Sequence, residues 1–133
     1  MVDYPEYCLR GISKINDITQ EGRVSANVFL PDERTALTRV DNCMETSINW
    51  EDDNQALAFT LRSFQNGIVR LGRAEIDRIN SLPASINEIG YERSVDPINS
   101  YHGNILFQNI ISSAVRRMIA ASLALASSKV IRK

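Results

Sequence analysis

Few side chains of this sequence could take part in catalysis, and His102 is the most prominent of them. It is the only histidine among the 133 residues, so a metal site or catalytic set that needs two imidazoles cannot be built. One nucleophile–base pair is still conceivable, with Cys8, Cys43 or a serine beside His102. His102 stands between Tyr101 and Gly103, and the glycine would let a ligand or another backbone come close. The alternative is a hydrogen-bonded histidine at the start of a strand.

Arg10 is the second candidate, because it stands beside Gly11 in a short apolar segment. A guanidinium in that setting requires an anionic partner, which is either a ligand or a structural carboxylate such as Glu45 or Glu92. The catalytic residues therefore stay unknown, with Arg10 and His102 as candidates. The residues predicted to bind a ligand are Arg10, Arg23, Tyr101, His102 and Asn104.

Motifs that reveal a mechanism are missing from the sequence. No Walker loop, no Gly-x-Gly-x-x-Gly and no Gly-x-Ser-x-Gly occurs. Glu51, Asp52 and Asp53 could ligate a hard cation, but they lack the spacing of a calcium loop, and capping of a helix explains them. We interpret Trp50, which precedes them, as a core residue rather than a stacking platform. We therefore predict neither a metal site nor a cofactor.

Composition indicates one globular domain that spans residues 1–133, with 44% hydrophobic and 23% charged residues. Cys8 and Cys43 form no Cys-x-x-Cys pair, so we interpret them as free thiols and predict a reducing, cytoplasmic location. The acidic, proline-containing start is unlike a secretory signal. The most apolar stretch, residues 118–126, is too short to span a bilayer.

Charge is divided unevenly along the chain. All 16 acidic residues precede Gly103, whereas five of the 15 basic residues follow it, which gives net charges of −6 and +5 on the two sides. Such asymmetry hints at an anionic partner. The alternative is that the basic tail meets the protein's own acidic surface or that of a second copy. No interleaved aromatic residues or glycines support nucleic-acid binding.

Periodicity predicts an α+β fold with a mixed, mostly antiparallel sheet, helices on one face of it and a long C-terminal amphipathic helix. Residues 32–43 are expected to form a loop. Strands are expected at residues 7–12, 23–30, 45–50, 68–71 and 101–107, with a weaker preference at 86–92, and helices at 56–64, 73–80 and about 109–130.

The last predicted helix has two distinct faces. Small residues in its second half would permit close contact, so we predict a homodimer or a contact with another protein through this helix, with Arg116 and Arg117 facing acids such as Glu51 or Asp52 of a second copy. The apolar face is predicted to comprise Phe107, Ile110, Ile111, Ala114, Val115, Met118, Ala121 and Leu125, and the outer face Gln108, Asn109, Ser112, Ser113, Arg116, Arg117 and Ala120.

Two resemblances cover parts of the chain. Between Leu9 and Phe107 it resembles small uncharacterised bacterial proteins without an agreed activity. The shared blocks, in the same order, are Leu9-Arg10-Gly11-Ile12, Gly22-Arg23-Val24-Ser25-Ala26, Ser47-Ile48-Asn49-Trp50, Gly67-Ile68-Val69-Arg70-Leu71 and Tyr101-His102-Gly103-Asn104. More distantly, Arg10-Gly11, Gly22-Arg23 and Ala56-Leu57 resemble the start of NAD-using domains of the ADP-ribosyltransferase and RES-toxin type. The catalytic glutamate motif of the transferases has no clear counterpart here, and the chain is short for that fold.

Two hypotheses of function follow. The first is a non-enzymatic interaction or accessory protein of a bacterial system, which binds a protein partner. The second, implied by the distant resemblance, is a small NAD- or nucleotide-handling enzyme that uses Arg10, Arg23 and His102. An enzyme predicts that these three residues converge in one pocket. An interaction protein predicts that they scatter and that an apolar patch lies on the surface.

Overall fold

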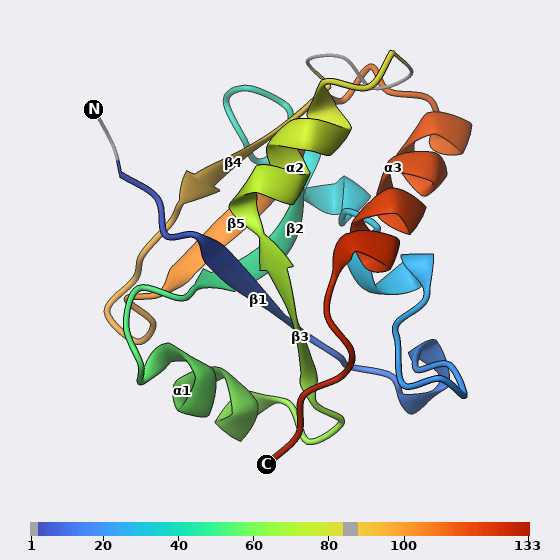
Figure 1. Cartoon of the computed structure of the whole chain (residues 1–133). Coiled ribbons are helices and arrows are strands. Elements are labelled where there is room, and N and C mark those ends of the chain that lie inside the picture. The colour runs from blue at the N-terminus through green and yellow to red at the C-terminus, as the bar shows by residue number, and fades with distance from the viewer. Residues whose placement is uncertain (1–2, 84–87) are drawn as a thin grey trace.

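The computed structural model describes residues 3–83 and 88–133, and it is built around a five-stranded sheet (Figure 1). The strands are β1 (Tyr7–Gly11), β2 (Met44–Trp50), β3 (Ile68–Gly72), β4 (Ile89–Arg93) and β5 (His102–Phe107). Their spatial order is β3-β1-β2-β5-β4, and all four described pairs are antiparallel. With the helices α1 (Ala56–Ser63), α2 (Arg73–Asn80) and α3 (Ser113–Ala126), the α+β class is confirmed.

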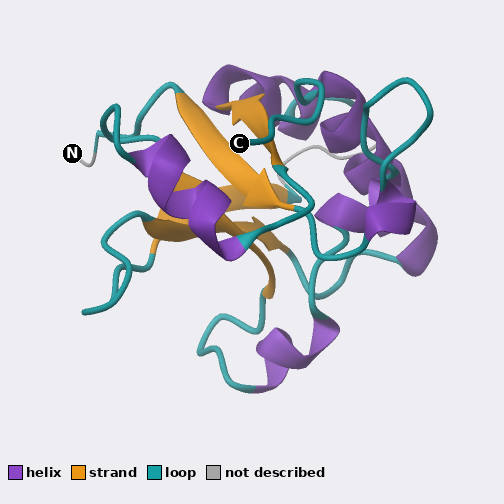
Figure 2. Ribbon diagram, turned by 90° about the horizontal axis from the view of Figure 1, so that it is seen from below, coloured by secondary structure: helices purple, strands orange, loops and turns teal. Residues whose placement is uncertain are grey.

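Helices lie on both faces of the sheet rather than on the single face that the sequence predicted, and different helices cover each face. On one face, α2 and α3 enclose the main core, which includes Trp50, Phe107 and Ile76. On the other face, α1 covers a smaller cluster around Leu9 and Ile68, and it lies apart from α2 and α3 (Figure 1). The chain has to pass across β1 to connect β2 with β3, and α1 forms on that crossover. Seen from the side of α1, this short helix lies in front of only part of the sheet (Figure 2).

The prediction of a strand at residues 23–30 is wrong. Val24 forms an isolated bridge with Ile18, and a 3-10 helix, η2, follows at Ala26–Phe29. Strict alternation would bury only every second side chain, but Val28 and Phe29 are both buried against the main core. Their carbonyl groups accept hydrogen bonds from the side chains of Arg10 and Thr46, which replace a strand partner. Further short 3-10 helices are η1 (Ile15–Asp17) and η3 (Glu33–Leu37), the latter inside the expected loop.

Helix α3 is shorter than expected, and its buried face differs from the predicted one. Its buried residues are Ile119, Ala120, Leu123 and Ala124, whereas Met118, Ala121 and Leu125 are exposed. Residues 118–126 are apolar all around the helix except for Ser122, so their periodicity does not fix which side faces the core. The helix begins at the cap Ser112 and ends before Ser127, after which the chain runs back to pair Ile131 with Ile68 of β3.

The other elements lie close to their expected bounds. The helix with Ile76 and Ile79 on one face is confirmed as α2, and Trp50 is confirmed as a core residue with no exposed surface. The first part of the expected strand at 86–92 lies outside the described residues, and β4 begins at Ile89. None of the described helices is long and apolar enough to cross a membrane.

Candidate functional site

A pocket of about 290 Å³ lies beside α1, where β1 and β2 separate. The strands pair only through Cys8–Trp50 and Leu9–Asn49, after which β1 continues with β3 alone. The walls combine an apolar part with a polar one. The apolar side chains are those of Leu9, Phe59, Phe64 and Ile98, and the polar ones are those of Arg10, Ser47, Asn49, Thr60, Ser63, Asn99 and His102. Gly11 and Ile48 complete the wall, although the side chain of Ile48 lies in the main core.

Arg10 fills the gap between the separating strands. Its Nε donates to the carbonyl of Val28 at 2.8 Å, and its Nη1 donates to the carbonyl of Ser47 at 2.8 Å. The structural pair expected with Glu45 or Glu92 is absent, since both carboxylates bind Arg39. No ion pair of Arg10 occurs in the described part of the chain. Burial lowers the pKa of the Arg10 guanidinium. The guanidinium therefore lies in the pocket wall in an environment that disfavours its charge, and no carboxylate of the described residues balances that charge.

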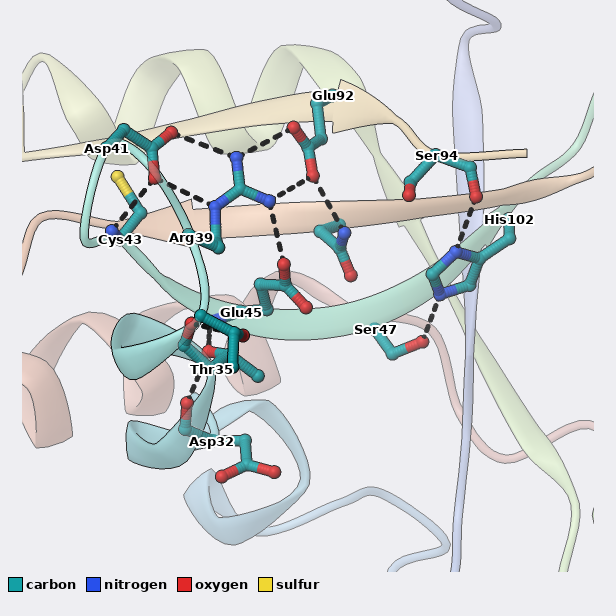
Figure 3. Close-up of polar contacts among 12 residues, drawn as sticks. Asp32, Thr35, Arg39, Asp41, Cys43, Glu45, Ser47, Glu92, Ser94 and His102 are labelled. Atoms are coloured by element: carbon teal, nitrogen blue, oxygen red, sulfur yellow. Dashed lines mark hydrogen bonds and ion pairs between the residues drawn. The ribbon is translucent and has the colours of Figure 1, made fainter. Parts of the chain in front are cut away.

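His102 faces the same pocket, and its two ring nitrogens have different partners (Figure 3). Nδ1 lies 2.8 Å from the carbonyl oxygen of Ser94, and Nε2 lies 2.7 Å from Oγ of Ser47. A carbonyl oxygen only accepts, so Nδ1 carries the proton in the neutral ring. The Ser47 hydroxyl therefore donates to Nε2. The position of the ring proton is thus fixed by a backbone group outside the pocket.

A chain of side-chain hydrogen bonds connects the pocket walls. Asn99 donates to Asn49 at 2.8 Å, and Asn49 donates to Thr60 of α1 at 2.9 Å. The loop that carries Asn99 and Ser94 is itself ordered by Asp96, which accepts from the backbone of Ile98 and Asn99. Strand β2, helix α1 and the loop before β5 are therefore held in fixed relation around the pocket.

The structure brings together only part of the predicted ligand-binding set. Arg10 and His102 line one pocket, but Arg23 lies at the end of α3, where it donates to the carbonyls of Leu125 and Ser127. Tyr101 donates its hydroxyl to Asp53, and Asn104 donates to Glu92. Convergence of Arg10, Arg23 and His102 is therefore not found.

Sequence reasoning did not single out Ser47, Asn49 or Asn99. The available signal was the spacing of Glu45, Ser47 and Asn49, three polar residues at every second position of β2, which places them on one face of the sheet. His102 lies directly opposite Asn49 on β5. The acids Glu51 and Asp52 pair with Arg70 and Arg93.

The two thiols are placed away from His102. Cys8 belongs to the main core on the opposite face of the sheet, and burial raises its pKa to about 12. Burial also raises the pKa of Cys43, which lies beside Asp41. A thiolate is the reactive form of cysteine, so these environments disfavour nucleophilic chemistry. Of the partners conceived for His102, a serine is the one observed.

A second polar cluster lies farther along the same strands and is centred on Arg39 (Figure 3). Its guanidinium binds Asp41 at 2.8 Å, Glu45 at 2.7 Å and Glu92 at 2.6 Å. These contacts hold the pKa of Asp41 well below its usual range and lower that of Glu92. Asn104 donates to Glu92, and its buried Oδ1 has no hydrogen-bond partner among the described residues. The cluster fixes the segment before β2 to the sheet.

Comparison with models of known protein families, with curated proteins and with solved structures finds no match. The two resemblances therefore stay predictions. Function has to be inferred from the geometry of the pocket itself.

Proposed function

We propose that the protein binds a small anionic molecule with a flat apolar part, of mononucleotide size, in the pocket beside α1. The observation that carries this proposal is Arg10, a guanidinium in the pocket wall that is bonded to two carbonyl groups and to no carboxylate of the described chain. A phosphate or carboxylate of a ligand would supply the missing counter-charge.

The rest of the pocket suits the apolar part of such a ligand. Phe59 and Phe64 offer aromatic surface, and Asn99 and His102 offer polar groups at the rim. A volume of about 290 Å³ lies at the lower end for small-molecule sites, which favours a mononucleotide over a dinucleotide. This is the nucleotide-handling hypothesis with Arg10 and His102 retained and without Arg23.

Calorimetric titration with AMP, ADP-ribose and inorganic phosphate tests the proposal. We expect saturable binding of AMP that weakens at least about 10-fold in Arg10→Met, since loss of a charged hydrogen bond is worth about 1.5–3 kcal/mol. Arg10→Lys should fold with the charge retained and bind at an intermediate level. Arg34→Met, which removes an exposed arginine on another surface, is the matched control. Absence of binding by all three ligands, or equal binding by wild type and Arg10→Met, would contradict the proposal.

A second candidate function is association through the outer side of α3. Leu125 and Met118 expose 77% and 43% of their surface there, which is unusual for large apolar side chains of one helix. The charge pairing expected between copies is reduced, since Arg116 binds Glu33 and the acids Glu51 and Asp52 are paired within the chain. A homodimer or a protein partner would therefore be held mainly by apolar contact. Free Cys8 and Cys43 support a cytoplasmic setting for either function.

Light scattering over a range of protein concentrations tests the association. We expect twice the chain mass of 14.9 kDa at micromolar concentration, and the chain mass for Leu125→Glu, which places a charge in the contact. Leu37→Glu is the control, because Leu37 is a leucine outside α3 that is even more exposed than Leu125. A monomer at every concentration would rule out the homodimer.

A further inference from the structure

We propose that Ser47 is a nucleophile activated by His102, and that the pocket accepts a carboxylic ester that carries a negative charge. The arrangement has the three parts that such activation needs: a nucleophile, a base and a group that orients the base. The Ser47 hydroxyl lies 2.7 Å from Nε2 of His102, and Nδ1 lies 2.8 Å from the Ser94 carbonyl. This fixes the tautomer in which Nε2 is free to accept the serine proton.

The position of Ser47 suits attack on a ligand. Its side chain is exposed and opens into the pocket, while the strand that carries it is paired with β5. The backbone carbonyl of Ser47 accepts a hydrogen bond from Arg10, so the proposed nucleophile and the guanidinium lie next to each other in the pocket wall. A purely structural serine–histidine contact would not require either feature.

The reaction balances without any further reactant except water. Oγ of Ser47 forms a bond to the ester carbonyl carbon as its proton passes to Nε2, and the carbonyl electron pair moves to oxygen. The intermediate collapses with cleavage of the bond to the alcohol oxygen, which takes the proton from Nε2. Water then attacks the acyl-serine in the same way, releases the carboxylic acid and restores Ser47. The Ser94 carbonyl stabilises the transient imidazolium through Nδ1–H.

The class of substrate follows from the pocket walls. Apolar side chains face the ester, and Arg10 attracts a phosphate or carboxylate elsewhere on the molecule. This preference for an anion rests on the proposed function, whereas the reactivity of Ser47 does not.

The test uses the full chain and two readouts. A fluorophosphonate that esterifies active serines is added, and the labelled peptide is identified by mass spectrometry. Hydrolysis of p-nitrophenyl acetate is compared with that of mono-p-nitrophenyl succinate. We expect one label on Ser47, a preference for the anionic ester, and a loss of about 100-fold or more in both readouts for Ser47→Ala and His102→Gln.

Ser113→Ala is the matched control, because Ser113 is an exposed serine at the start of α3 and does not line the pocket. It should react as wild type does, and thermal unfolding shows that each variant is folded. No label on wild-type Ser47, or unchanged hydrolysis in Ser47→Ala, would overturn the nucleophile even if AMP still binds. Labelling of Ser47 with equal use of both esters, and no effect of Arg10→Met, would overturn the anionic substrate and leave the nucleophile standing.

Discussion

Replacement of Gly103 by alanine should destabilise the protein by about 3 kcal/mol or more. A Cβ at this position would come within 2.7 Å of Cδ1 of Trp50 and closer still to its Nε1 and to the carbonyl oxygen of Glu92. Those two atoms form a hydrogen bond of 3.0 Å across the glycine. The indole has no exposed surface, so it cannot move aside without loss of core packing.

Gly90→Ala is the control for this prediction. Gly90 lies on the neighbouring strand β4, and a Cβ there would meet no atom of residues 3–83 or 88–133 within 4 Å. Chemical unfolding should show the large loss for Gly103→Ala and a change within about 0.5 kcal/mol for Gly90→Ala. Equal stability of the two variants would mean that Trp50 does not cross Gly103 in the folded protein.

Replacement of Arg39 by methionine should cost about 2 kcal/mol at neutral pH, because it leaves Asp41, Glu45 and Glu92 close together without a cation. The side chains of Arg39, Glu45 and Glu92 are only 19%, 24% and 25% exposed, so water screens the repulsion incompletely. The exposed pair Arg34–Asp32 provides the comparison, and Arg34→Met should leave stability almost unchanged, because water screens this pair.

The same cluster predicts a pH dependence. Arg39 lowers the pKa of Asp41 and of Glu92 in the folded state, so their contribution is present above the unfolded pKa of about 4 and is lost as pH falls through the folded values. Wild-type stability should therefore decrease below about pH 4, and the difference from Arg39→Met should shrink there. A difference that stays constant from pH 7 to pH 3 would show that the carboxylates do not depend on Arg39.

Several elements could be predicted from the sequence because their signals are local. Helix α2 presents Ile76 and Ile79 on one side, and the β-branched run of β3 has no competing pattern. The strand predicted at residues 23–30 was wrong because the prediction used only the local alternation of apolar residues. In the structure, Val28 and Phe29 are buried together by packing against α3, which is distant in sequence. The buried face of α3 was predicted wrongly for a related reason, because residues 118–126 are apolar on nearly every side of the helix.

The candidate site, like the fold, could be predicted only in part. Arg10 and His102 could be selected because their residue types were unusual in their segments. Their meeting depends on the strand order, which puts β2 between β1 and β5, and on the premature separation of β1 from β2. A serine on the exposed face of a strand is not distinctive by itself, so Ser47 became distinctive only once the register placed it diagonally beside His102.

The central claim is that an anion binds between Arg10 and His102, and nuclear magnetic resonance of the single histidine tests it most directly. Because His102 is the only histidine, its ring signals in a ¹⁵N-labelled sample need no assignment. We predict the tautomer protonated at Nδ1, and a saturable shift of both ring nitrogens on addition of AMP that is strongly reduced in Arg10→Met. A ring protonated at Nε2, or signals that stay unmoved up to millimolar AMP, would contradict the account.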